Sequence, residues 1–131
     1  MSAVQAFLYS HLTGDVVLSN LVGGAIYDAA PAGDLPEIAI IIGAEEVIDV
    51  SDAGASARLH RAEVEIIARG PGFLAAKDVA GNIRRVLEAA SGPVSNGHVT
   101  RTQFRRAQSL RETADGLRRI RMRFDLFFDE Q

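Results

Sequence analysis

The chain has 131 residues, of which 47% are hydrophobic and 24% are charged, and it contains no cysteine. A chain of this length can bury about two-thirds of the surface that its unfolded form exposes, so we expect one compact soluble domain over residues 1–131. The absence of cysteine excludes a disulfide scaffold, thiol catalysis and cysteine-based metal sites. The longest apolar run, Ile38 to Ile42, is too short to cross a membrane.

Charge is divided unevenly along the chain, whose net charge is −3. Residues 1–57 hold eight acidic residues and no Lys or Arg, whereas residues 58–131 hold all 14 basic residues and nine acidic ones. The net charges of the two parts are therefore −8 and +5. This division is compatible with two solvated faces of a monomer, and equally with complementary surfaces that meet between subunits or against a partner.

The first 36 residues predict two short helices followed by a loop. Apolar residues and one histidine recur with helical spacing, and Gly14 ends this first helix. Asp15 is placed to cap a second helix, which Gly23 and Gly24 end. A loop then runs to Pro36, whose missing N–H suits the entrance of a strand. The residues expected on the buried faces are Val4, Phe7, Leu8, His11 and Leu12 in the first helix and Val17, Leu18 and Leu21 in the second.

Two strands and a helix are predicted in the middle of the chain. Ile38 to Ile42 is continuously apolar, as expected for a central strand covered on both faces. Residues 45–54 are acidic and then small, which indicates a strand end that opens into a loop. The second strand alternates between apolar and charged residues up to Arg69, and Pro71 is placed to start a helix that residues 92–93 end. This helix carries an apolar stripe of Phe73, Ala76, Ala80, Ile83, Leu87 and Ala90.

Two long strands joined by a turn at Asp115 and Gly116 are predicted at the C-terminus. The first runs from Val94 to about Ala107 with weak alternation. The second alternates clearly, with apolar residues facing the core and arginines facing outward. The predicted fold is therefore α+β, with helices packed on one face of a mainly antiparallel four-stranded sheet in the order α-α-β-β-α-β-β.

The sequence contains no recognisable catalytic or cofactor-binding motif. Phosphate-binding loops, dinucleotide-binding glycine motifs, paired-histidine metal spacings and nucleophile elbows are all missing. Glu45 and Glu46 are neighbours in a strand, so their side chains are expected on opposite faces. His11 is expected to be a partly buried core residue, and His60 has only Glu63 as an acidic neighbour. We predict no enzyme, cofactor or metal, although a catalytic group assembled only in space is left open by the sequence.

Eight arginines lie between residues 101 and 123, against two acidic residues. Such a cluster is typical of a surface that contacts the phosphates of nucleic acid. Only Phe127 offers an exposed aromatic ring for base stacking, and the acidic pI of about 5.6 disfavours a dedicated nucleic-acid-binding protein. Pairing with the acidic half of a neighbouring copy explains both halves of the charge distribution. The eight are Arg101, Arg105, Arg106, Arg111, Arg118, Arg119, Arg121 and Arg123.

Three segments carry a resemblance to a known family. They are residues 21–27 (LVGGAIY) with the Pro36 and apolar strand that follow, residues 64–80 (VEIIARGPGFLAAKDVA), and residues 115–119 (DGLRR) before the last strand. Over nearly its whole length the chain resembles the small tail-completion, tail terminator-like proteins of tailed phages and phage-derived gene transfer agents. The positions that match the family pattern are Gly23, Gly24, Ile26, Tyr27, Arg69, Gly72, Phe73 and Lys77.

The resemblance implies a structural role in virion assembly, with no catalytic residues. Tail terminators are α+β subunits that form a hexameric ring on the end of the tail tube, stop its polymerisation and present the head-joining surface. The implied partners are other copies of the chain, the tail tube protein, a head-closure protein and DNA that passes through the lumen without sequence-specific binding, with no membrane. The implied location is the head–tail junction of a virion or phage-like particle that is assembled in the host cytoplasm.

The charge division then gives a hypothesis for the subunit or ring–ring contacts, which we expect at the acidic segment and the arginine cluster. Reversal of two charges, Arg119→Glu with Arg121→Glu, is expected to abolish assembly while the monomer stays folded. Alternatively, the acidic segment lines the lumen and repels passing DNA. The proposed contact residues are Glu45, Glu46, Asp49, Asp52, Arg118, Arg119, Arg121 and Arg123.

Two other functions stay open at this point. One keeps the virion context but makes the protein a neighbouring head–tail connector, such as a head-closure component, which would stay with isolated heads and not with isolated tails. A small cytosolic ligand-binding domain or enzyme is less favoured, because the motif search gives it no support.

Overall fold

The computed structural model describes residues 2–29, 33, 36–49, 57–70, 73–111 and 116–130. They form helices and strands in the order α1 (Ala3–Thr13), α2 (Val16–Val22), β1 (Ile26–Tyr27), β2 (Ile38–Asp49), β3 (Ala57–Arg69), α3 (Leu74–Glu88), β4 (Gly92–Val94), β5 (Gly97–Arg111) and β6 (Leu117–Glu130). One sheet contains all these strands in the order β1-β2-β3-β6-β5-β4. β1 is parallel to β2, and every other neighbouring pair is antiparallel.

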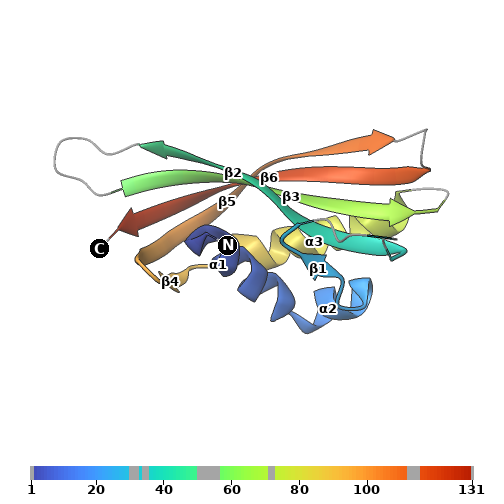
Figure 1. The fold of residues 1–131 in the computed structure, drawn as a ribbon, viewed down its shortest axis with the longest axis horizontal. Coiled ribbons are helices and arrows are strands. Elements are labelled where there is room, and N and C mark those ends of the chain that lie inside the picture. Colours follow the sequence, from blue (N-terminus) through green and yellow to red (C-terminus); the bar gives the residue numbers. More distant parts are fainter. Residues whose placement is uncertain are drawn as a thin grey trace.

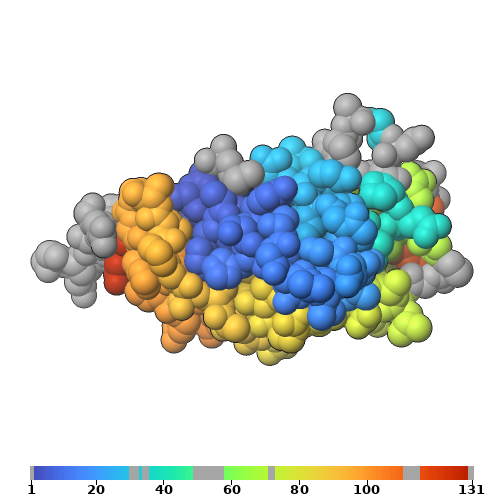
Figure 2. Space-filling view, turned by 90° about the horizontal axis from the view of Figure 1, so that it is seen from below, coloured from blue at the N-terminus to red at the C-terminus, as the bar shows by residue number. Residues whose placement is uncertain are grey.

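The helices form a single layer against the sheet, as predicted. Figure 1 shows α1, α2 and α3 on the same side of the strands, and Figure 2 looks onto this layer with the three helices packed beside one another. We call the side under the helices the helix-covered face and the opposite side the open face. The α+β class is confirmed, but the four-stranded sheet was wrong, because the described residues form six strands.

The two strands missed by the sequence pattern are both very short. β1 has two residues and is held against β2 by the Ile40 N–H, which donates to the Ala25 carbonyl oxygen at 2.9 Å. β4 has three residues, includes Pro93 and forms a tight hairpin with the start of β5. Alternation needs at least four residues to be recognisable, so neither strand has a readable signal. The observed order is therefore α-α-β-β-β-α-β-β-β.

Side-chain and glycine caps set the limits of the first two helices. Ser2 and Gln5 form a reciprocal capping box at the start of α1. Asp15 caps α2 as predicted, because its Oδ2 accepts from the Leu18 N–H at 3.0 Å. Gly23 ends α2 with a φ of 60°, a conformation that favours glycine. The prediction that Val17 faces the core was wrong, since its side chain is 51% exposed.

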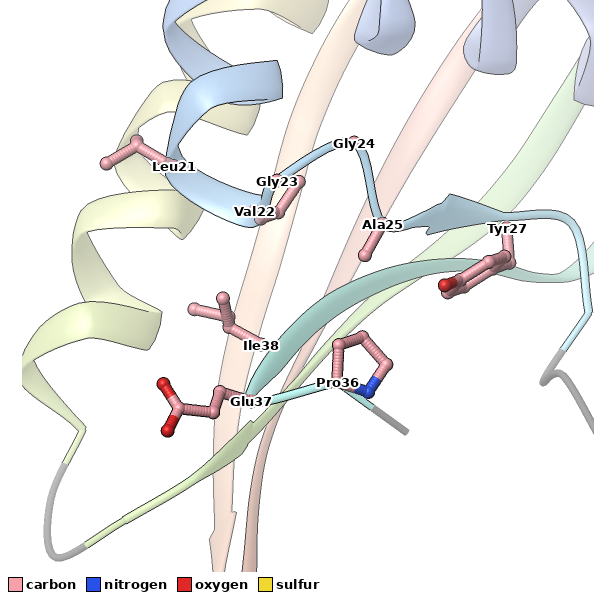
Figure 3. Close-up of a pocket in the computed structure, with 9 residues that line it drawn as sticks. All are labelled: Leu21, Val22, Gly23, Gly24, Ala25, Tyr27, Pro36, Glu37 and Ile38. Carbon is pink, nitrogen blue, oxygen red and sulfur yellow. The ribbon is translucent and has the colours of Figure 1, made fainter. Parts of the chain in front are cut away.

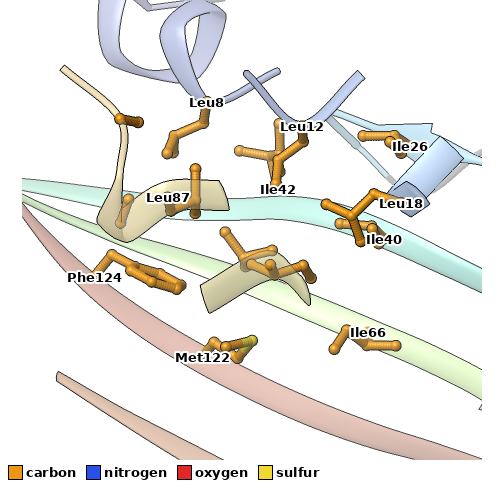
Figure 4. Packing of buried hydrophobic residues seen from close by; sticks show 14 of the residues in the cluster. Leu8, Leu12, Leu18, Ile26, Ile40, Ile42, Ile66, Leu87, Met122 and Phe124 are labelled. Carbon is orange, nitrogen blue, oxygen red and sulfur yellow. The ribbon is translucent and has the colours of Figure 1, made fainter. Parts of the chain in front are cut away.

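The core lies between the helix layer and the helix-covered face. Leucines from all three helices meet branched and aromatic residues from β2, β3 and β6 (Figure 4). The predicted stripe of α3 is confirmed at its centre, where Ala76, Ile83 and Leu87 are buried, and Val79 joins them. The labelled core residues are Leu8, Leu12, Leu18, Ile26, Ile40, Ile42, Ile66, Leu87, Met122 and Phe124.

The predicted central strand is confirmed as an interior strand, because β2 lies between β1 and β3. On the open face, β2 is covered by a small cluster in which Ile41, Ile67 and Leu117 are buried together against Tyr27. A register shift between Ile42 and Glu45 marks a bulge in β2. Since one extra residue reverses the alternation, the acidic end of the strand presents its side chains in the opposite order from the apolar start.

Candidate functional site on the open face

The open face carries alternating acidic and basic side chains on three adjacent strands. In the register of the sheet, β3 and β6 place Arg61 opposite Asp125, Glu63 opposite Arg123, and Glu65 opposite Arg121. Opposite charges directly across two strands stabilise a sheet by about 0.2–1 kcal/mol per pair. The outward face of β6 is therefore a mixed-charge surface that β3 partly neutralises.

Glu65 is the centre of the strongest ion-pair group on this face. Arg119 Nη1 donates to Glu65 Oε1 at 3.1 Å, and Arg121 Nε donates to Glu65 Oε2 at 2.7 Å. Arg121 Nε also lies 3.5 Å from Glu63 Oε1. The Glu65 side chain is only 15% exposed, so these bonds are partly shielded from water. Two of the arginines proposed for a subunit contact are thus bonded within their own chain.

The other two arginines of the proposed contact differ from each other. Arg118 has its guanidinium over the Phe73 ring, with 5.5 Å between Cζ and the ring centroid, and its Nε is buried without a hydrogen-bond partner. It therefore lies apart from the outward arginines and stacks beside the start of α3. Arg123 is exposed on the open face and lines a hollow of about 160 Å³ together with Glu46 and Arg61.

The acidic residues of the proposed contact are also separated by the structure. As predicted, Glu45 and Glu46 point to opposite faces. Glu45 Oε2 lies 3.2 Å from His60 Nδ1, whereas Glu46 is exposed and opposite Arg61. Asp49 is the last residue of β2, and Asp52 lies outside the described residues.

The glycine pair of the family-like motif lines a hollow of the described surface. Gly23 and Gly24 have φ values of 60° and 78°, so glycine is favoured at both. Together with Tyr27, Pro36 and Ile38 they line a volume of about 420 Å³ between the end of α2 and the start of β2 (Figure 3). The prediction that these glycines end a helix is confirmed.

The remaining family-like positions have ordinary structural roles where they are described. Ile26 is buried in the core, and the Arg69 N–H donates to the Glu37 carbonyl oxygen at 2.8 Å. Phe73 precedes α3 without a side-chain cap, and Lys77 is exposed on α3. Gly72 and the predicted helix start at Pro71 lie outside the described residues.

Two features of the open face were missed by sequence reasoning. Asp125 is 4% exposed between Arg61 Nε at 3.5 Å and Arg105 Nε at 3.4 Å. Its position in the alternation of β6 places it on the charged face, but its burial depends on neighbours from two other strands. The second is the pairing of Arg106 with Arg123, which a bulge between Phe104 and Arg106 brings into register.

Two of the described histidines contact aromatic and acidic neighbours one at a time. His11 contacts the Phe7 ring at 4.4 Å between centroids, and His60 contacts Glu45 and the Phe128 ring. Across the described ranges no three His, Asp or Glu residues are arranged to hold a metal ion. In the same part of the chain, the helices are too short or too polar to traverse a bilayer.

Asp15 links α2 to α3 and gives stability a pH dependence. Arg85 donates to both carboxylate oxygens, at 3.2 and 2.8 Å. These bonds, and next the Leu18 N–H, hold the pKa of Asp15 below its ordinary value of 3.8. The pKa of Asp15 is therefore lower in the folded protein than in the unfolded chain. The ion pair contributes its full stabilisation at pH values above the pKa of the unfolded chain, and this contribution is lost as the pH falls through the pKa of the folded protein.

Asp15→Asn is therefore expected to be less stable than wild type at neutral pH, because Asn retains the cap but loses the charge. The difference in urea midpoint should shrink as the pH falls from about 6 to about 2.5. Asp28→Asn is the control, since its carboxyl is exposed and makes no ion pair with the described residues. A difference that stays constant over this range would contradict the assignment.

The comparisons with known proteins agree with the resemblance found in the sequence. A family model described as "Tail completion protein gp17" matches residues 6–129. A chain of a solved structure titled "Virion of native gene transfer agent (GTA) particle" is 34% identical and superposes with a TM-score of 0.89. The alignment covers 97% of this chain and 95% of that chain. No curated protein sequence matches. The chain therefore belongs to the tail completion protein family.

Proposed function

We propose that this protein is the tail terminator of a phage-like particle. Six copies form a ring on the end of the tail tube, stop its polymerisation and present the surface to which the head joins. The observation that carries the proposal is the full-length similarity to a chain of a gene transfer agent virion within a family of tail completion proteins. The protein acts as a structural subunit and not as an enzyme.

The partners follow from this position at the head–tail junction. The ring contacts the tail tube protein on one side and a head-closure protein on the other, and DNA passes through its lumen without sequence-specific recognition. Assembly takes place in the host cytoplasm. A closed ring of this kind uses two different surfaces of each subunit, and the −8 and +5 parts of the chain supply complementary charges for them.

The test is electron microscopy of particles from cells that lack the gene. Overlong tails that lack heads are expected, and the wild-type gene supplied in trans should restore joined particles of normal length. Tails of normal length without heads would assign the chain to a neighbouring connector such as head closure. Particles of normal length, fully joined and able to deliver DNA, would contradict both assignments.

A further inference from the structure

Two arginines on the open face lie directly opposite each other. Arg106 in β5 pairs in register with Arg123 in β6, and both side chains are exposed. Neither forms an ion pair or hydrogen bond with the part of the chain that the structure describes. Like charges directly opposite in a sheet are destabilising, so this pair is unfavourable in an isolated subunit. An anion between the two guanidinium groups removes that penalty.

The surroundings of the pair favour a single carboxylate. Arg106 and Arg123 line a hollow of about 210 Å³ together with Gln108, Arg121 and Glu63. Gln108 offers amide donors, whereas Arg121 is already bonded to Glu65. Glu63 brings a negative charge to the wall of the hollow, which repels a continuous phosphate backbone. One side-chain carboxylate, held by two guanidinium groups, fits this pattern of charge.

A candidate carboxylate is present on the same face in β2, where Glu46 lies two strands from Arg123, with which it lines the hollow of about 160 Å³ without forming an ion pair, and three strands from Arg106. Of the acidic residues proposed for a contact, Glu45 is occupied by His60, but Glu46 is exposed and makes no ion pair with another described residue. β2 and β5 are separated by β3 and β6 in the sheet order. A head-to-tail neighbour brings one side of a subunit against the opposite side of the next, and so brings Glu46 toward Arg106.

We infer that Glu46 of one subunit places its carboxylate between Arg106 and Arg123 of the next subunit. The inference rests on the proposed ring, in which every subunit gives one carboxylate and receives one. Of the eight residues of the sequence hypothesis it uses Glu46 and Arg123, which are exposed and form no ion pair with other described residues, and it adds Arg106.

Arg106→Glu is the variant that separates assembly from folding. Within one chain, the new carboxylate lies opposite Arg123 and replaces a repulsive pair by an attractive one, so the urea midpoint is expected to rise. The same change fills the receiving site and repels Glu46 of the neighbour, so the variant should fail to restore joined particles in cells that lack the gene. Lys77→Glu, an equal charge change on the exposed side of α3, should restore them fully. Normal particles from Arg106→Glu would overturn the inference.

Crosslinking identifies the occupant while both charges are kept. Because the chain has no cysteine, Ala44→Cys with Gln108→Cys gives two unique thiols beside Glu46 and Arg106. Three strand spacings, about 14 Å, separate them within one chain, so a bismaleimide shorter than this distance joins only different chains. A ladder of crosslinked copies in lysates of particle-producing cells is expected. Crosslinks to a cysteine of another tail protein, or no crosslinks at all, would overturn the second copy as occupant.

The two proposals fail in different ways. Joined particles of normal length in cells that lack the gene would reject the terminator function, whatever the crosslinks show. Overlong tails without heads in those cells, together with no crosslinked ladder, would reject the Glu46 contact and leave the terminator function intact.

Discussion

Gly97→Ala is expected to lower the free energy of unfolding by about 3 kcal/mol, near the upper end of the cost of overpacking. Gly97 is buried at the start of β5, where it pairs with Val94 and with Glu130. A Cβ there would lie 2.2 Å from the Asp129 carbonyl oxygen and 2.8 Å from Cζ of Phe128. Neither neighbour can move easily, because one is strand backbone and the other is a buried ring.

Gly81→Ala is the matched control for this variant. Gly81 lies in the middle of α3, and a Cβ at that position meets no atom within 4 Å. The same addition of one methyl group should therefore stabilise the protein by about 0.5–1 kcal/mol. Denaturant unfolding of both variants measures the difference. A Gly97→Ala protein as stable as wild type would show that the start of β5 and the end of β6 do not pack as closely as described.

The sequence predicted the long elements because their burial repeats over many residues. The apolar stripe of α3 extends over four or more turns, and the alternation of β6 extends over four or more residue pairs. One unusual residue therefore does not hide either pattern. β1 and β4 are too short for any period, and Gly97 shows no sign of its constraint in the sequence, since its limit comes from residues 128 and 129. Bulges in β2 and β5 were also invisible, because they depend on the register with a partner strand.

The candidate site was predicted in composition but not in pairing. The alternation of β6 correctly placed arginines 119, 121 and 123 on one outward face. It could not show that Glu65, more than fifty positions earlier, accepts bonds from two of them. Nor could it show that Glu45 is turned toward His60 by a bulge, while Glu46 stays exposed. Sequence spacing gives the face of a side chain, and the partner across the sheet depends on strand order.

The bonds from Arg119 and Arg121 to Glu65 change the expected effect of the double substitution Arg119→Glu with Arg121→Glu on stability. From the sequence alone the variant is expected to lose assembly and keep its fold. In the structure, both arginines bond to Glu65, so the variant places two new carboxylates beside Glu65 and Glu63. Removing the partners of a partly buried charge and adding like charges is expected to cost about 3 kcal/mol or more of unfolding free energy.

The expected result is a subunit that unfolds at a lower urea concentration, with part of the loss recovered when Glu65→Arg is added, because opposite charges then face each other again. Urea unfolding of the purified variants measures both changes. Arg106→Glu provides the contrast, since its midpoint should rise while assembly fails. If the double reversal instead unfolds at the wild-type midpoint, the bonds to Glu65 contribute little, and Arg119 and Arg121 return as candidates for the contact between subunits.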